Sequence, residues 1–219
     1  MLPLVEWSYQ VIDLGLVAVA SPPLVDGASV VEACRAAEGG GATAVQVRFK
    51  DYPASVLLDV TERLVTALSI PVYVNDRADV ALAASATGVH LGTEDIPPAT
   101  VRGLAAKPFR IGVSVGTNDE AGAVFAVDVD YWSIGSIYAT ASKSDAGAPI
   151  GIGGFTSLAR LAPEGMPVIA IGGIEASNAR PVLEAGANGV AVISAVFGAT
   201  DIEGGARRLR DIVDEVRRV

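Results

Sequence analysis

Residues 167–196, PVIAIGGIEASNARPVLEAGANGVAVISAV, hold two short runs rich in β-branched residues on either side of a run that contains Ala and Leu. We expect residues 167–173 and 189–196 to be strands and residues 176–185 to be the helix between them. The pair Gly186 and Ala187 before the second strand is typical of a helix C-cap that leads directly into a strand. This stretch therefore predicts a strand–helix–strand unit with parallel strands.

The same alternation runs along the whole chain. Six further strands are expected at residues 15–20, 44–49, 71–75, 88–92, 110–115 and 131–137, and helical stretches such as 54–68 separate them. A charged amphipathic helix at 201–218 ends the chain, and residues 1–14 are expected to cap the bottom of the domain. Eight strands alternating with helices predict an α/β fold, a single (β/α)8 TIM barrel over residues 1–219, because closure leaves no edge strand. An open doubly wound sheet is the alternative.

Composition limits the classes of function. Of the 219 residues, 51% are hydrophobic and 5% aromatic, so the core must be largely aliphatic, as in parallel sheets covered by helices. The net charge of −9 argues against a nucleic-acid-binding surface. No run approaches the roughly 18 apolar residues of a membrane span, and the N-terminus lacks the basic start of a signal peptide. With a single cysteine, Cys34, expected to be a buried thiol, the chain is expected to be a soluble cytoplasmic protein.

Polar residues and glycines interrupt the apolar runs at their C-terminal ends, strand after strand. In a (β/α)8 barrel these ends converge on one mouth, where active sites lie. The residues in these positions include Gln46, Arg48, Lys50, Asn75, Asp76, His90, Asp95, Ser114, Thr140, Ser142, Lys143, Gly172, Gly173 and Ser194. His90 is the only histidine, which excludes a cluster of histidine ligands, and a lone histidine in an apolar strand is more often a hydrogen-bonded core residue.

Taken one by one, these residues also have structural interpretations. The alternation of Gln46, Arg48 and Lys50 places them on one strand face, which is also the pattern of a solvated edge strand. Asp76 is suitably placed to cap a helix starting near residue 78. Asp95, before Ile96 and Pro97, is suitably placed either to cap a helix or to form a turn.

Taken together, they indicate a site for phosphorylated ligands. The carboxylates of Asp76 and Asp95 are suited to a magnesium ion, which shares phosphate oxygens with nearby cations. The cations expected at this mouth are Arg48, Lys50 and Lys143. Backbone N–H groups near Gly173 and at residues 193–194 lie where such barrels commonly bind a phosphate. The site is therefore expected to hold a diphosphate near the early strands and a monophosphate near the late ones.

In seven segments, taken in order, the chain resembles the thiamine-phosphate synthase family. The segments are QVRFK (46–50), VNDRAD (74–79), GVHLGTEDIP (88–97), GVS (112–114), DY followed by GSIYATASK (130–143), AIGGI (170–174) and AVISA (191–195). The resemblance implies a (β/α)8 barrel that joins 4-amino-2-methyl-5-hydroxymethylpyrimidine diphosphate to a thiazole phosphate or its carboxylate. The implied products are thiamine phosphate and diphosphate, and the implied cofactor is Mg²⁺.

The resemblance also assigns residues. It implies that the pyrimidine diphosphate is bound by Gln46, Arg48, Lys50, Asn75, Ser114 and Lys143. Of these, Arg48, Lys50, Lys143 and Ser114 would assist the departure of diphosphate. It implies Asp76 and Asp95 as Mg²⁺ ligands, and a thiazole phosphate site made of Thr140, Ser142, Gly173, Ile193 and Ser194. The chain departs from the family pattern in its first strand, residues 15–21, which lacks the usual aromatic residue.

Two other functions share the fold. A thiazole tautomerase would use a histidine near position 116, where this chain has Gly116, and would lack much of the magnesium and diphosphate set. A non-catalytic phosphate-binding barrel would keep the late glycines and lose the carboxylate pair. Residues 138–154 form a long Gly-, Ala- and Ser-rich connection, for which the sequence suggests a lid over the substrates.

Overall fold

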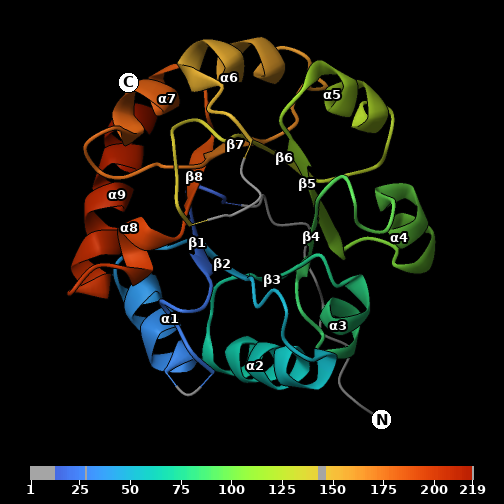
Figure 1. Cartoon of the computed structure of the whole chain (residues 1–219), viewed down its shortest axis with the longest axis vertical. Coiled ribbons are helices and arrows are strands. Elements are labelled where there is room, and N and C mark those ends of the chain that lie inside the picture. The colour runs from blue at the N-terminus through green and yellow to red at the C-terminus, as the bar shows by residue number, and fades with distance from the viewer. Residues whose placement is uncertain (1–12, 28, 143–146, 219) are drawn as a thin grey trace.

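In the computed structural model, which describes residues 13–27, 29–142 and 147–218, eight parallel strands close into a barrel in the order β1 to β8. Helices surround the strands on all sides (Figure 1). The strands are β1 (Leu16–Ala20), β2 (Ala44–Val47), β3 (Val72–Asn75), β4 (Gly88–Leu91), β5 (Arg110–Val115), β6 (Tyr131–Ile134), β7 (Val168–Ile171) and β8 (Gly189–Val192). Pairing of β1 with β8 closes the ring, so the predicted barrel is confirmed and the open sheet is wrong.

The helices follow the strands in alternation. They are α1 (Val30–Gly39), α2 (Ala54–Ala67), α3 (Ala78–Ala83), α4 (Pro98–Leu104), α5 (Asn118–Val124), α6 (Gly151–Ala159), α7 (Ala179–Glu184), α8 (Ser194–Phe197) and α9 (Ile202–Arg217). Helix α9 lies beside α1, α7 and α8 in Figure 1. The Asp201 side chain caps it by accepting a hydrogen bond from the Gly204 N–H at 2.9 Å.

The strand period of two divides the side chains between two cores. On β2, for example, Val45 and Val47 pack in the layer between sheet and helices, whereas Ala44 packs inside the barrel. Gln46 therefore also points into the barrel. The interior is narrow and mostly filled, so polar side chains on inward positions near the strand ends have to meet one another at the mouth.

Several strands end earlier than expected. Strand β8 stops at Val192, and residues 194–197 form the short helix α8 instead of continuing the strand. Strand β2 likewise stops at Val47, so Arg48 and Lys50 lie in the loop that follows it. The expected connection at 138–154 is shorter at its far end, because α6 already begins at Gly151. The predicted helix at 176–185 is confirmed in its second half, Ala179–Glu184.

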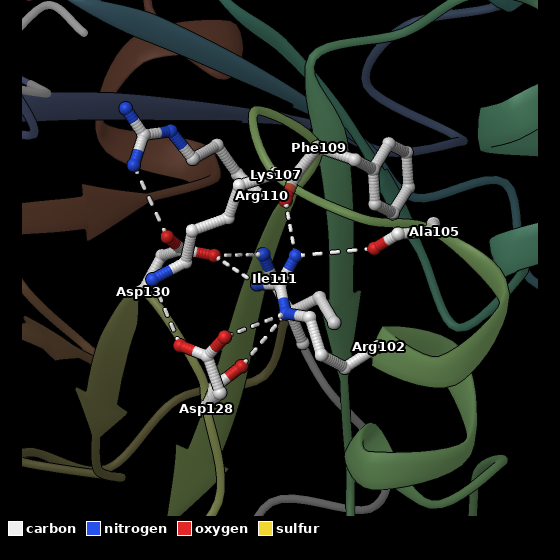
Figure 2. Close-up of polar contacts among 8 residues, drawn as sticks. All are labelled: Arg102, Ala105, Lys107, Phe109, Arg110, Ile111, Asp128 and Asp130. Carbon is white, nitrogen blue, oxygen red and sulfur yellow. Dashed lines mark hydrogen bonds and ion pairs between the residues drawn. The ribbon is translucent and has the colours of Figure 1, made fainter.

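An ion-pair network centred on Asp130, directly before β6, lies at the N-terminal end of the barrel (Figure 2). One carboxylate oxygen of Asp130 accepts from Arg102 Nη2 at 2.6 Å and from the Ile111 N–H at 2.8 Å. The other accepts from Arg110 Nη1 at 3.1 Å. The side chain of Asp130 is 4% exposed, so these bonds replace its hydration shell. The network ties α4, β5 and β6 together.

Asp13 joins the two ends of the described chain. It accepts from Arg210 Nη1 at 3.0 Å and from Arg217 Nη1 at 2.8 Å, both on α9. The next residue, Leu14, is 2% exposed and packs in the inner core. The remainder of the predicted N-terminal cap, residues 1–12, lies outside the described residues.

Cys34 is a buried free thiol on α1, as expected, and burial raises its pKa to about 12. Across the described ranges, none of the helices has the length and apolar character that a membrane span requires.

Candidate active site

The structure places the predicted site residues that it describes at one end of the barrel. Gln46 lies on β2, Asn75 ends β3 and Ser114 lies near the end of β5. The others follow a strand, and they are Arg48, Lys50, Asp76, Asp95, Thr140, Ser142, Gly173, Ile193 and Ser194. These are all C-terminal strand ends, the face on which active sites of such barrels are built.

The side chains of Gln46 on β2 and Asn75 on β3 are in direct contact. Gln46 Nε2 donates to Asn75 Oδ1 at 2.7 Å, which leaves the oxygen of the first amide and the nitrogen of the second for other partners. Gln46 is 5% exposed and Arg48 is 7% exposed, whereas Lys50 is exposed. Because the first two are buried and β2 is paired on both sides, the interpretation as a solvated edge strand is wrong.

The carboxylates of Asp76 and Asp95 lie against each other. Burial, with a hydrogen bond to Asp95 and the negative charge of Asp95, raises the pKa of Asp76 to about 6. Lys50 and Arg48 are close enough to lower it in part. Two carboxylates and two cations that are distant in sequence therefore share one small region.

The backbone around the carboxylate pair fixes this arrangement. Asp76 adopts a left-handed conformation, φ 64°, and its N–H donates to the His90 carbonyl at 2.8 Å. Helix α3 has Arg77 at its N-cap, so the interpretation of Asp76 as the helix cap is wrong. Asp95 does not cap a helix, because Pro97 is the N-cap of α4. It does form the expected turn, since its Oδ2 accepts from the Gly92 N–H at 2.7 Å. The turn directs Asp95 toward β3.

This donor set suits magnesium. Within the described residues, no group of three or more His, Cys, Asp or Glu side chains forms a cage for a metal. Mg²⁺ is usually held by one or two carboxylates together with substrate phosphates and water. Asp76 and Asp95, whose mutual repulsion a cation would relieve, fit that mode of binding.

The predicted residues from the late strands surround a small hollow of about 30 Å³. Its lining includes Thr140, Ser142, Gly173, Ile193 and Ser194. Ser142 Oγ lies 3.4 Å from Oγ of Ser194, and Ser194 is the first residue of the short helix α8. Gly173 has φ 64°, and a Cβ there would lie 2.5 Å from the Ala139 carbonyl oxygen, so a side chain at this position would displace the loop after β6.

Lys143 and its neighbours up to residue 146 lie outside the described residues. Its meeting with Arg48 and Lys50, and the lid suggested for residues 138–154, therefore remain predictions. The two ends of this loop are described and anchored. Tyr138 N–H donates to the Gly172 carbonyl at 2.9 Å, and Ile150 N–H donates to the Ser136 carbonyl at 2.9 Å.

His90 is a buried, hydrogen-bonded residue, as the sequence suggested. Its Nδ1 lies 3.0 Å from the Tyr131 hydroxyl and its Nε2 lies 3.0 Å from Ser114 Oγ. The contact to Ser114 was not predicted. Alternate positions of a strand share a face, so the placing of residues 88, 90 and 92 on the inward face could have indicated it. Tyr131 was quoted in the DY motif without a role.

A much larger cavity, about 630 Å³, lies at the N-terminal end of the barrel and is lined by Asp13, Tyr73 and Arg110 among others. It contains none of the predicted site residues. The fold and the residues at the C-terminal ends of the strands define the class of protein. The chain is a (β/α)8 barrel with carboxylates and cations after its early strands and a hollow after strands seven and eight, where such barrels commonly bind phosphate.

Comparisons with known proteins agree with that class. The model of the family described as thiamine monophosphate synthase matches residues 16–196. The thiamine-phosphate synthase of Moorella thermoacetica is 44% identical over 205 residues, which cover 92% of this chain and 97% of the relative. The one from Methanospirillum hungatei is 41% identical over 204 residues, 92% of this chain and 98% of the relative.

A solved structure, the thiamine phosphate pyrophosphorylase from Pyrococcus furiosus, superimposes with a TM-score of 0.83 at 37% identity. The match covers 94% of this chain and 98% of that one. The chain belongs to the thiamine monophosphate synthase family, a family of transferases in thiamine biosynthesis.

Proposed function

We propose that this barrel joins an aminopyrimidine diphosphate to a thiazole phosphate, or its carboxylate, and releases thiamine phosphate and diphosphate. The observation that carries the proposal is the division of the mouth into two halves. One half holds the carboxylate pair with Arg48 and Lys50, and the other holds the hollow lined by Gly173 and Ser194. Two phosphorylated substrates with reacting rings between them would match this division.

The proposed reaction is a dissociative substitution. The bond between the pyrimidine methylene carbon and the diphosphate oxygen breaks first, and the electron pair leaves with diphosphate. The electron-rich aminopyrimidine stabilises the resulting cation, which the thiazole nitrogen then attacks. No nucleophile from the protein is needed, so the task of the chain is to neutralise the departing anion and to hold the two rings face to face.

Each predicted residue has a role in this scheme. Asp76 and Asp95 would hold Mg²⁺, which when bound supplies positive charge to the departing diphosphate. Arg48, Lys50 and Lys143 would bind the diphosphate oxygens, and the remaining roles fall to neutral groups. Gln46, Asn75 and Ser114 would hold the pyrimidine diphosphate, and Thr140, Ser142, Gly173, Ile193 and Ser194 the thiazole phosphate. A cytoplasmic location is also proposed, in keeping with the free thiol of Cys34.

The direct test supplies both substrates and Mg²⁺ and measures thiamine phosphate and diphosphate. We expect equal amounts of the two products, and loss of both in excess chelator. Thiazole isomerisation without coupling would indicate a tautomerase. Ligand binding without any turnover would indicate a non-catalytic barrel. Either result would overturn the proposal.

A thermal-shift measurement tests the role of Lys143. Inorganic diphosphate with Mg²⁺ should raise the melting temperature, because a ligand at 100 times its dissociation constant adds about 2.7 kcal/mol to the free energy of unfolding. Lys143→Ala should weaken binding at least about tenfold, which removes about 1.4 kcal/mol of that gain. Lys107→Ala is the matched control, since Lys107 pairs with Asp128 near the opposite end of the barrel. If diphosphate raises the melting temperatures of the two variants equally, Lys143 does not bind the diphosphate.

A further inference from the structure

A chain of three polar side chains crosses the barrel interior to the mouth. Tyr131 on β6 contacts His90 on β4, and His90 contacts Ser114 on β5, each at 3.0 Å. Tyr131 is 1% exposed and His90 is 5% exposed, whereas Ser114 is half-buried. This series of hydrogen-bonded side chains therefore begins in the buried interior and ends at the Ser114 hydroxyl, which lies at the proposed substrate site.

Packing fixes the first two members of this chain. A Cβ at Gly112 would lie 2.0 Å from Cζ of Tyr131, so the ring fits across β5 only because this inward position has no side chain. The rings of Tyr131 and His90 are stacked with centroids 5.6 Å apart. Tyr73 packs edge-on against Tyr131, with centroids 5.7 Å apart. These packing contacts hold the two rings against each other in the buried interior.

Hydrogen-bond accounting selects one tautomer of His90. Burial raises the pKa of Tyr131 well above its usual range, so its phenol keeps its proton and needs an acceptor. Within the described residues, His90 Nδ1 is the hydrogen-bond partner of that hydroxyl. If Nδ1 carried a proton, the buried phenol proton would be left without an acceptor. Nδ1 therefore accepts, Nε2 carries the proton, and Nε2 donates to Ser114 Oγ.

We propose that Tyr131 and His90 are positioning residues that fix the hydroxyl of Ser114 as a hydrogen-bond donor toward the mouth. Because Ser114 Oγ accepts from His90, its own proton points to the side on which substrate arrives. The substrate atom that meets Ser114 must then be an acceptor, such as a diphosphate oxygen. The consequence for turnover rests on the proposed function, but the tautomer does not.

The tautomer can be measured without substrate. His90 is the only histidine in the chain, so long-range ¹H–¹⁵N spectra of tag-free protein report one imidazole and need no assignment. We expect Nε2 to be protonated and Nδ1 to be bare in the wild-type protein. Tyr131→Phe removes the donor and should shift the ring toward a mixture of tautomers. A wild-type ring protonated at Nδ1 would overturn the proposal, and so would a Tyr131→Phe spectrum equal to that of the wild type.

A double-mutant cycle tests the effect on turnover. Tyr131→Phe should lower kcat/KM about tenfold, in the range expected for a lost or misdirected hydrogen bond. In a Ser114→Ala background the same change should have almost no further effect, because Tyr131 acts through Ser114. A merely structural role would give the same loss in both backgrounds, and that result would contradict the proposal.

Tyr73→Phe is the matched control. It removes a hydroxyl from the same interior, and that hydroxyl has no hydrogen-bond partner within the described residues. We expect unchanged kcat/KM and an unchanged His90 spectrum in this variant. If the predicted tautomer is found but wild-type protein makes no thiamine phosphate, the proposed function fails and the positioning of Ser114 stands. If wild-type protein makes thiamine phosphate but His90 is protonated at Nδ1, the proposed function stands and the positioning of Ser114 fails.

Discussion

Asp130→Ala is expected to lower the free energy of unfolding by about 3–5 kcal/mol, because it removes the buried carboxylate to which two largely buried guanidinium groups donate. Arg102 and Arg110 are 13% and 14% exposed in their side chains, and both donate to Asp130. The Ile111 N–H would also lose its acceptor. For a chain of this length, such a loss corresponds to a fall in melting temperature on the order of 10 °C, measurable by calorimetry.

Asp128→Ala provides the matched control. Asp128 contacts Arg102 at 3.4 Å and Lys107 at 2.8 Å, but its side chain is 54% exposed. Solvated ion pairs contribute about 0–1 kcal/mol, so this variant should melt close to the wild-type temperature. If the two variants lost equal amounts of stability, the burial of Asp130 would not explain its contribution to the free energy of unfolding. Turnover of Asp130→Ala, measured well below its melting temperature, should stay near normal.

Asp130 and Asp76 illustrate what the sequence could predict. Both are aspartates next to a strand, but Asp130 precedes β6 and Asp76 follows β3. In a (β/α)8 barrel that difference alone assigns one to the stabilising end and the other to the functional end. The side of the barrel on which each candidate lies was therefore predictable from strand order. The proximity of Asp76 and Asp95 followed from their position after neighbouring strands.

The interior contacts could not be predicted in the same way. Tyr131 reaches His90 across Gly112, so the contact depends on a side chain that is missing from the strand between them. Its geometry also requires the register of β4, β5 and β6, which no pattern in the sequence specifies. The strand ends were misplaced for a related reason, since β-branched residues such as Ile193 and Val196 favour a strand even where tertiary structure makes a turn and a helix.

Asp95→Asn is expected to reduce turnover at least about 100-fold, equal to roughly 2.7 kcal/mol of transition-state stabilisation, as when a metal-bound charge is lost from a departing anion. Asparagine keeps an oxygen that can accept from the Gly92 N–H, so the turn should survive. Asp79→Asn removes the same charge from the exposed start of α3, where Asp79 pairs with Arg77. That control should keep near-normal turnover in the assay of thiamine phosphate.

The metal-free stability of Asp95→Asn should change in the opposite direction to its activity. The pKa of Asp76 is raised from 3.8 to about 6, so its contribution to stability is favourable below pH 3.8 and is lost as the pH rises through about 6. Burial contributes most to this rise in pKa, and the hydrogen bond and negative charge of Asp95 add to it. Removing the charge of Asp95 relieves the repulsion between the two carboxylates. At pH 7.5 without Mg²⁺ the variant should therefore melt at or above the wild-type temperature, with a smaller difference at pH 5. Full turnover in Asp95→Asn, or a loss of stability that grows between pH 5 and 7.5, would contradict a shared magnesium site on this carboxylate pair.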